Sequence, residues 1–422
     1  MVIASSWLGP AYGADLAIVG ATVLPVSAPP IPDGTVLVSN GKIAAVGADV
    51  VVPEGTEILD ASGSFLMPGI IDVHSHMGVY AWPSARAHGD GNEAIDPVTA
   101  RVRAEDSVHV SDPAFSRARA GGVTTVQILP GSANLVGGES SILKLRPSRT
   151  LEKMRFVGAP RGIKMACGEN PKRVYGDDIH GPSTRMGSLA SMRAAFQAAK
   201  DYRDARGTHR DPPPTDHNLE TLLDVMDGKI RLHVHCYRHD DIEGIYRVMD
   251  EFGVQVASIQ HALEAYKVRD IIIEHGTGIA TWADWWGFKM EAYDGIPHNA
   301  AMVKNDGGIV AIHSDSSNQV QRLNIQAAKT LRYGMSEASA LETITLDPAK
   351  MLGIEETVGT IAVGKDADLA LFNAHPLDMY SLNTHTWIDG QLVFERAMEH
   401  FNRRNFQMAE ELLTETLDLR PH

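Results

Sequence analysis

The chain has 422 residues, more than one ordinary domain, and can hold a barrel of about 250 residues together with a smaller module. Hydrophobic residues make up 44% and charged residues 22%, a globular composition that excludes a disordered chain. The formal net charge of -15 argues against a nucleic-acid partner, because a phosphate backbone requires a basic protein face.

The N-terminal segment, residues 1–14, is apolar and rich in small residues, like the later part of a signal peptide, although it lacks a basic start. It predicts an exported protein, periplasmic or secreted rather than cytoplasmic. No other run reaches ~18 apolar residues, so we expect no membrane span.

Short strands separated by turns follow, at residues 16–24, 34–38 and 42–47. Asn40 and Gly41 lie between the last two strands and are a strong hairpin signal, because both residue types tolerate positive φ. Matching strands return near the far end, at residues 367–372 and 386–394. We therefore predict one small β-sandwich domain built from residues 15–66 and 358–396.

The middle of the chain, residues 67–357, alternates short apolar runs with helical patterns. Helices are expected at residues 189–205 and 241–252, and strand candidates at residues 122–129, 162–166, 230–235, 255–261, 278–281 and 309–313. Such alternation implies an α/β fold with a parallel sheet, and the count suits a (β/α)8 TIM-like barrel. A doubly wound open sheet would not explain why polar residues stand at the strand ends.

Two inserts and a tail interrupt this rhythm. Residues 80–112 and 168–217 are long, and loops of this kind usually build the pocket over a barrel mouth. Residues 397–422 have an amphipathic helical pattern that resembles one tetratricopeptide repeat. Since a single repeat cannot stack on neighbours, we expect a helix pair packed on this protein or on a second copy in a homo-oligomer.

Histidines and charged residues stand in or just after the apolar runs. His74 and His76 lie one residue apart on the same face of a strand, close enough to bind one cation. The others, in order, are Lys164, His235, His261 and Asp315. In a barrel these strand ends meet at one mouth, and imidazole with carboxylate suits zinc, with other divalent transition metals as weaker candidates. The two cysteines, Cys167 and Cys236, are too few for a multi-cysteine metal site.

At this point the sequence resembles the metal-dependent amidohydrolase superfamily, in particular imidazolonepropionase-like and Xaa-Pro dipeptidase-like enzymes. The resemblance covers about residues 15–396, and the similar motifs are residues 67–76, 258–261, 313–316 and 358–369. It implies that His74, His76 and Asp315 hold one metal. It also implies further ligands from strand five and strand six.

The ligands from strand five (residues 230–235) and strand four (residues 162–166) are assigned less directly. His233 shares a face with His235, and the similarity of residues 234–237 to the family's strand-five motif favours His235. His261 is the expected strand-six ligand. The resemblance also implies that Lys164, carboxylated by carbon dioxide, bridges two ions, although the segment after it departs from the family pattern. Glu139, Glu169 or a single-metal site therefore remain alternatives.

The implied reaction is hydrolysis of a C–N bond in a small molecule, such as an amide, a cyclic amide or a dipeptide. A bound divalent ion lowers the pKa of its water from 15.7 to about 7, so that metal-bound hydroxide is available as the nucleophile. Asp315 would act as general base, and His261 would orient the water if one metal is bound.

Two other functions stay open: a deaminase of the same superfamily, and a non-catalytic metal-binding or scaffold protein that uses its tail. Residues 282–289 are rich in aromatics and either wall the substrate pocket or pack against the barrel rim. Candidate substrate contacts are Tyr237, Arg238, Arg173 and His313.

Overall fold

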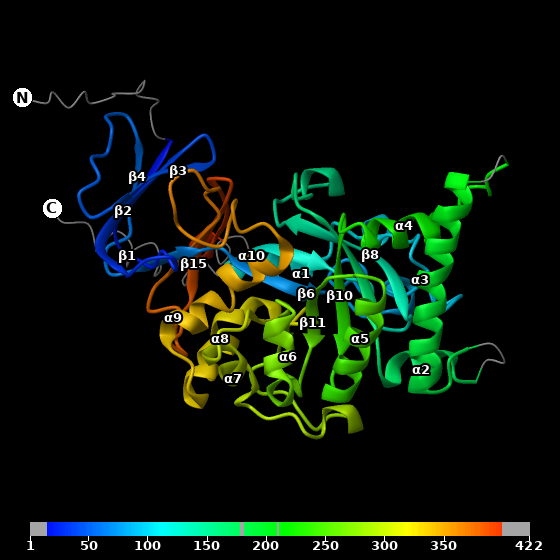
Figure 1. Cartoon of the computed structure of the whole chain (residues 1–422). Helices are drawn as coiled ribbons and strands as arrows, with labels where there is room; N and C mark the ends of the chain where they lie inside the picture. The colour runs from blue at the N-terminus through cyan, green and yellow to red at the C-terminus, as the bar shows by residue number, and fades with distance from the viewer. Residues whose placement is uncertain (1–14, 178–180, 209–210, 399–422) are drawn as a thin grey trace, which may run out of the picture.

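The computed structural model describes residues 15–177, 181–208 and 211–398. The signal-like segment 1–14 and residues 399–422 of the repeat-like tail lie outside the described residues. Within the described part there are two sheets, a small one at one side of the molecule and a barrel beside it (Figure 1).

Strands from both ends of the chain share the small sheet, where blue N-terminal and orange C-terminal strands lie side by side (Figure 1). Its strands are β1 (Leu16–Val23), β2 (Ile31–Ser39), β3 (Lys42–Gly47), β4 (Glu57–Asp60), β5 (Phe65–Pro68), β14 (Leu369–Phe372), β15 (Asn383–Ile388) and β16 (Gln391–Glu395). The join is the antiparallel pairing of β5 with β14. This confirms a small β-domain formed by both chain ends, with a buried core of its own that includes Ile18, Leu66 and Trp387.

Turn chemistry shapes two hairpins of this sheet. Asn40 (φ 52°) and Gly41 (φ 75°) connect β2 to β3, as expected. The strand expected over residues 386–394 is instead a hairpin, because Asp389 (φ 51°) and Gly390 (φ 72°) turn the chain between β15 and β16. Asp-Gly is a strong turn signal that the apolar run around it obscured.

The second sheet is the barrel, with strand order β13-β12-β11-β10-β9-β8-β7-β6. Its strands are β6 (Ile70–Ser75), β7 (Val123–Ile128), β8 (Val136–Lys144), β9 (Arg161–Ala166), β10 (Ile230–Cys236), β11 (Val256–His261), β12 (Gly278–Thr281) and β13 (Val310–Ile312). The two ends of this order meet where the Asp315 amide donates to the His74 carbonyl at 3.0 Å. The predicted barrel is therefore confirmed.

One strand departs from the regular βα pattern. β8 is antiparallel to both β7 and β9, and no strand was expected there from the sequence. Only residues 129–135 separate β7 from β8, whereas a parallel crossover needs about a dozen residues or more. The short connection therefore reverses the strand.

Helices cover the outside of the barrel (Figure 1). They are α1 (Pro113–Ala120), α2 (Glu169–Tyr175), α3 (Arg185–Thr208), α4 (His217–Met226), α5 (His239–Glu251), α6 (Arg269–Glu274), α7 (Asn299–Asn305), α8 (Leu323–Lys329), α9 (Glu337–Glu342) and α10 (Leu346–Leu352). The expected helices 189–205 and 241–252 correspond to α3 and α5. None of the helices in the described ranges has both the length and the apolar character needed to cross a bilayer.

Candidate active site

The two histidines of β6 present the same ring nitrogen to one carboxylate. His74 Nε2 lies 3.7 Å and His76 Nε2 3.4 Å from Oδ1 of Asp315. The other nitrogen of each ring is engaged, since His76 Nδ1 lies 2.8 Å from the Leu129 carbonyl and His74 Nδ1 lies 2.9 Å from Oε1 of Gln260. Because both partners are acceptors, both Nδ1 atoms carry the proton, and both Nε2 lone pairs are free for a cation.

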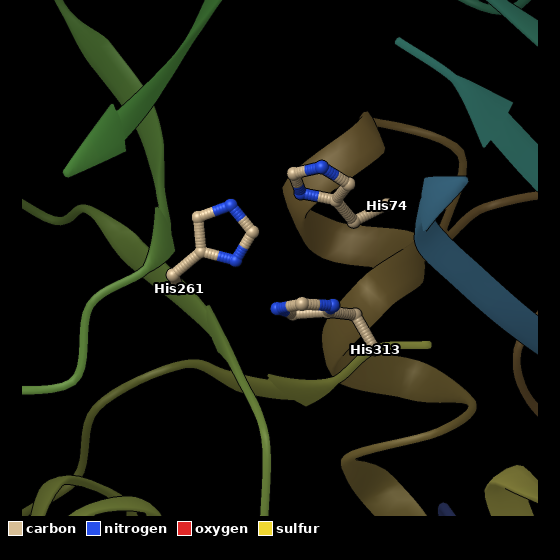
Figure 2. Close-up of side chains that lie close together, drawn as sticks. All are labelled: His74, His261 and His313. Atoms are coloured by element: carbon tan, nitrogen blue, oxygen red, sulfur yellow. The ribbon is translucent and has the colours of Figure 1, made fainter. Parts of the chain in front are cut away.

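Three further imidazoles complete the cluster. The His261 ring lies 4.6 Å from those of His74 and His235, and the His313 ring lies 4.9 Å from that of His74. Figure 2 shows the rings of His74, His261 and His313 turned toward one another. Their nearest nitrogens lie within 4.8 Å of one another, a spacing that could hold a metal ion. Nδ1 of His235, Nδ1 of His261 and both nitrogens of His313 are buried without a hydrogen-bond partner in the described ranges.

A left-handed backbone conformation orients two of the side chains at the site, those of His261 and Asp315. Gln260 points into the barrel, so strand alternation would turn its neighbour His261 outward; a φ of 73° at His261 turns it back. Asp315 has a φ of 48° just beyond β13. Non-glycine residues in this region are strained, and such strain concentrates at functional sites.

Lys164 extends from β9 into the same cluster. It is 1% exposed, and its ammonium makes one hydrogen bond in the described ranges, to the Pro130 carbonyl at 3.4 Å. Burial lowers its pKa, although Asp315 opposes the shift. Burial also raises the pKa of Asp315; the charge of Lys164 opposes this shift, and Asp72 adds to it.

The imidazoles of the cluster are neutral at pH 7. Burial, and then the charge of Lys164, lowers the pKa of His76 to about 3 and lowers those of His74 and His235 well below the usual value. The same two causes act on His313, whose pKa falls to about 3. A neutral imidazole keeps the lone pair that a metal needs.

Neither alternative carboxylate, Glu139 or Glu169, belongs to the two groups of candidate ligands whose atoms lie within 4.8 Å of one another in the described ranges. Glu139 is opposite Ile163 in the antiparallel β8–β9 pair, and opposed residues share a face, so it lies on the face that Lys164 avoids. There it accepts two hydrogen bonds from Arg161, at 2.7 and 2.9 Å. Glu169, at the start of α2, is 3.3 Å from the Lys289 ammonium.

Of the four candidate substrate contacts, two lie at the histidine cluster, and the other two have different surroundings. Tyr237 stacks on His261 at 4.9 Å, and His313 lies in the cluster. Arg238 pairs with Asp240, and Arg173 is an exposed residue of α2.

Sequence reasoning missed the residues that hold the candidate ligands. Asp72 accepts hydrogen bonds from the Ser314 amide and hydroxyl, at 3.2 and 2.5 Å, and so fixes the end of β13 against β6. The signal was present, because Asp72 shares its strand face with His74 and His76. Gln260 supports His74 across the barrel, a long-range contact that sequence spacing does not reveal, and it also donates to Ser258 Oγ at 2.8 Å.

The two cysteines form a disulfide, a pairing that was not predicted. It joins Cys167, just after β9, to Cys236, the last residue of β10, with 5.4 Å between the Cα atoms. The ends of the two strands that carry Lys164 and His235 are thereby linked covalently.

Comparisons with known proteins give matches over most of the chain. The sequence model of the amidohydrolase family matches residues 65–393. A crystal structure of an amidohydrolase from Thermotoga maritima is 40% identical, with a TM-score of 0.85, and the match covers 90% of this chain and 100% of that chain.

Two curated proteins illustrate the range of relatives. Amidohydrolase tasK of Hapsidospora irregularis is 35% identical over 393 residues, covering 86% of this chain but 40% of that protein. The chain therefore spans less than half the length of tasK. Imidazolonepropionase of Colwellia psychrerythraea is 26% identical, covering 81% of this chain and 86% of that protein.

Proposed function

The chain belongs to the amidohydrolase family and is an enzyme acting on C–N bonds, and we propose that it is a metal-dependent hydrolase of an amide, cyclic amide or dipeptide. The observation that carries this proposal is the convergence of His74 Nε2 and His76 Nε2 on one oxygen of Asp315. Neutral imidazoles and a carboxylate around one point are donors that suit a divalent transition metal.

The donor set supports two neighbouring positions for metal ions. His74, His76 and Asp315 would hold one ion, while His235 and His261 would contribute to a second, with His313 close to both His74 and His261. Nitrogen and oxygen donors favour zinc. A divalent ion bound here supplies a water acidic enough to react at neutral pH and polarises the substrate carbonyl.

Lys164 would serve as the bridging ligand after carboxylation. A buried ammonium with one long hydrogen bond is costly, and its lowered pKa increases the fraction of neutral amine that can react with carbon dioxide. The resulting carbamate would bring a negative charge to a cluster that otherwise has five histidines around it.

Asp315 would carry the proton during hydrolysis. Its side chain is 25% exposed, so it meets both the candidate ligands and the solvent side of the cluster. It would take a proton from the attacking water and deliver it to the leaving nitrogen, a transfer that contributes on the order of 10² to 10⁴ in rate.

The test is metal analysis of the purified chain, followed by a screen of dipeptides, N-acyl amino acids and lactams. We expect one or two metal ions per chain, loss of activity with a chelator and recovery with zinc. Release of ammonia from an amino-substituted ring would favour the deaminase alternative. Metal content near zero, together with no hydrolysis, would overturn the proposal.

We also propose that the protein works outside the cytoplasm. The Cys167–Cys236 disulfide supports this location, since such bonds are uncommon in reducing compartments. Cell fractionation with an antibody tests it, and recovery of the native protein from the cytoplasm alone would contradict it.

A further inference from the structure

Aromatic side chains lie directly beside the histidine cluster. We define the aromatic wall as Tyr237, Trp282, Trp285 and Phe288. The rings of Tyr237 and Trp282 stack on His261 at 4.9 and 4.6 Å. Trp285 and Phe288 continue outward from Trp282 at 5.4 and 5.7 Å. The wall thus runs without a break from a candidate metal ligand to the protein surface.

Exposure increases along the wall. Tyr237 is 5% exposed and Trp282 9%, whereas Trp285 is 43% and Phe288 52% exposed. Rings that served only to pack the loop against the barrel rim would be more completely buried, because each Å² of apolar surface left in water forgoes about 25 cal/mol. The two outer rings therefore keep apolar surface free at the margin of the site.

Charged side chains hold both ends of the loop that carries the outer rings. Asp284 pairs with Lys329 of α8 at 2.8 Å. At the other end, the Lys289 ammonium lies 4.0 Å from the centre of the Tyr237 ring and donates to Asn170 Oδ1 at 3.3 Å. A preformed wall of this kind binds a ligand without first having to be ordered.

An aromatic ring also borders the other side of the cluster. Tyr80, 36% exposed, packs edge-on against His76 with 5.6 Å between ring centres. His76 and Asp315 are the partly exposed members of their candidate ligand group, with side-chain exposures of 20% and 25%. The solvent side of the cluster is therefore bordered by aromatic surface on two flanks.

We propose that the aromatic wall binds a planar apolar group of the substrate, an aromatic side chain or aromatic acyl group adjacent to the scissile C–N bond. This inference rests on the proposed function and specifies its substrate class. Offset stacking and edge-to-face contacts with Trp285 and Phe288 would recognise such a group. Each such contact stabilises the complex beyond the contribution of the apolar area that it buries. The reacting carbonyl would then lie toward His261 and Asp315.

The test compares matched substrates that differ only in one group. Dipeptides with alanine or phenylalanine at one position, and N-acetyl or N-benzoyl amino acids, are assayed with the metal-loaded full chain. We expect kcat/KM to be roughly tenfold or more higher for the aromatic member of a pair, mainly through a lower KM. In Trp285→Ala and Phe288→Ala, this preference should fall about threefold to tenfold.

Trp286 provides a matched control. It lies on the same loop and is equally exposed at 43%, but its ring contacts no other ring in the described ranges. Trp286→Ala should keep the aromatic preference. Equal hydrolysis of aromatic and aliphatic members, or an unchanged preference in both wall variants, would overturn the inference.

Absence of turnover for every substrate would instead overturn the proposed function. In that case calorimetric binding of N-benzoylglycine and N-acetylglycine still decides the inference. Tighter binding of the benzoyl compound that is lost in Phe288→Ala supports the wall, and equal binding of both compounds contradicts it.

Discussion

At the scale of single residues, the site depends on side chains that orient the candidate ligands. Gln260 is fully buried, accepts from His74 Nδ1 and donates to Ser258 Oγ, which in turn lies 2.8 Å from His233 Nδ1. This series of hydrogen bonds fixes the tautomer of His74 and hence the direction of its free lone pair. Partners of this kind typically account for 10- to 100-fold in metal affinity, as a rough guide.

We therefore predict that Gln260→Leu weakens metal binding by about 10- to 100-fold, measured by competition with a chelator. Gln260→Glu keeps an acceptor for His74 Nδ1 and should recover most of the affinity. Gln127→Leu is the control, because Gln127 is also fully buried in the barrel but donates to Ser140 Oγ rather than contacting a candidate ligand. Equal metal affinity in Gln260→Leu and Gln127→Leu would refute the orienting role.

Lys164 gives a second prediction at this scale. Lys164→Ala should lose nearly all activity, and bicarbonate should speed reconstitution of the metal-free wild-type protein, because a carbamate forms only from the amine and carbon dioxide. The measurement is recovered activity against time, with and without bicarbonate. Full activity in the alanine variant would contradict the role of Lys164 and show that the histidines and Asp315 are sufficient for the metal site.

At the scale of strands, period-2 alternation in an apolar run predicted His74 and His76 on one face, and the structure places both in the cluster. Alternation could not predict His261, whose positive φ departs from strand geometry. It also could not separate Glu139 from the cluster, since the face of Glu139 follows from the reversed direction of β8. Spacing along a chain specifies a face only once strand direction and backbone conformation are known.

The disulfide belongs to this scale because it links the ends of β9 and β10. It closes a loop with a sequence separation of 69 residues, for which the chain-entropy account gives a stabilisation of about 4 kcal/mol. We predict that dithiothreitol lowers the urea midpoint of unfolding and also reduces activity, because Lys164 and His235 lie on the linked strands. A Cys167→Ala, Cys236→Ala double variant should already be destabilised and should not respond to the reductant. An unchanged midpoint of the wild-type protein under reduction would contradict this role.

At the scale of the whole molecule, apolar runs and turn residues were sufficient to predict a barrel and a small domain that joins both ends of the chain. They did not predict how the two are attached, because that depends on side chains far apart in sequence. Lys144, at the end of β8, is 1% exposed and pairs with Asp366 at 2.7 Å, Asp368 at 3.1 Å and Asp389 at 2.5 Å, all from the small domain. This buried cluster fixes the barrel to the small sheet.

Removing the charge of Lys144 tests the role of this cluster. Lys144→Met removes the shared cation and leaves three carboxylates together, so we expect a loss of about 3–5 kcal/mol in the free energy of unfolding. Lys42→Met is the control: Lys42 also pairs with Asp366, at 2.8 Å, but its side chain is 55% exposed, so its loss should cost less than about 1 kcal/mol. Equal midpoints of urea unfolding for the two variants would show that the cluster does not hold the domains together.

The loss of stability in Lys144→Met should depend on pH. Burial raises the pKa of Asp368 to about 6, so the folded protein binds a proton more tightly than the unfolded chain, and this contribution to stability is lost as pH rises through 6. Without Lys144 the carboxylates lose the charge that favours their ionised form, and protonation is their remaining route to neutrality. The destabilisation by Lys144→Met should therefore be larger at pH 7 than at pH 5, in urea titrations at the two values. A penalty independent of pH would mean that the variant loses apolar packing of the lysine stem against Phe156, whose ring centre lies 4.9 Å from Nζ, rather than charge compensation.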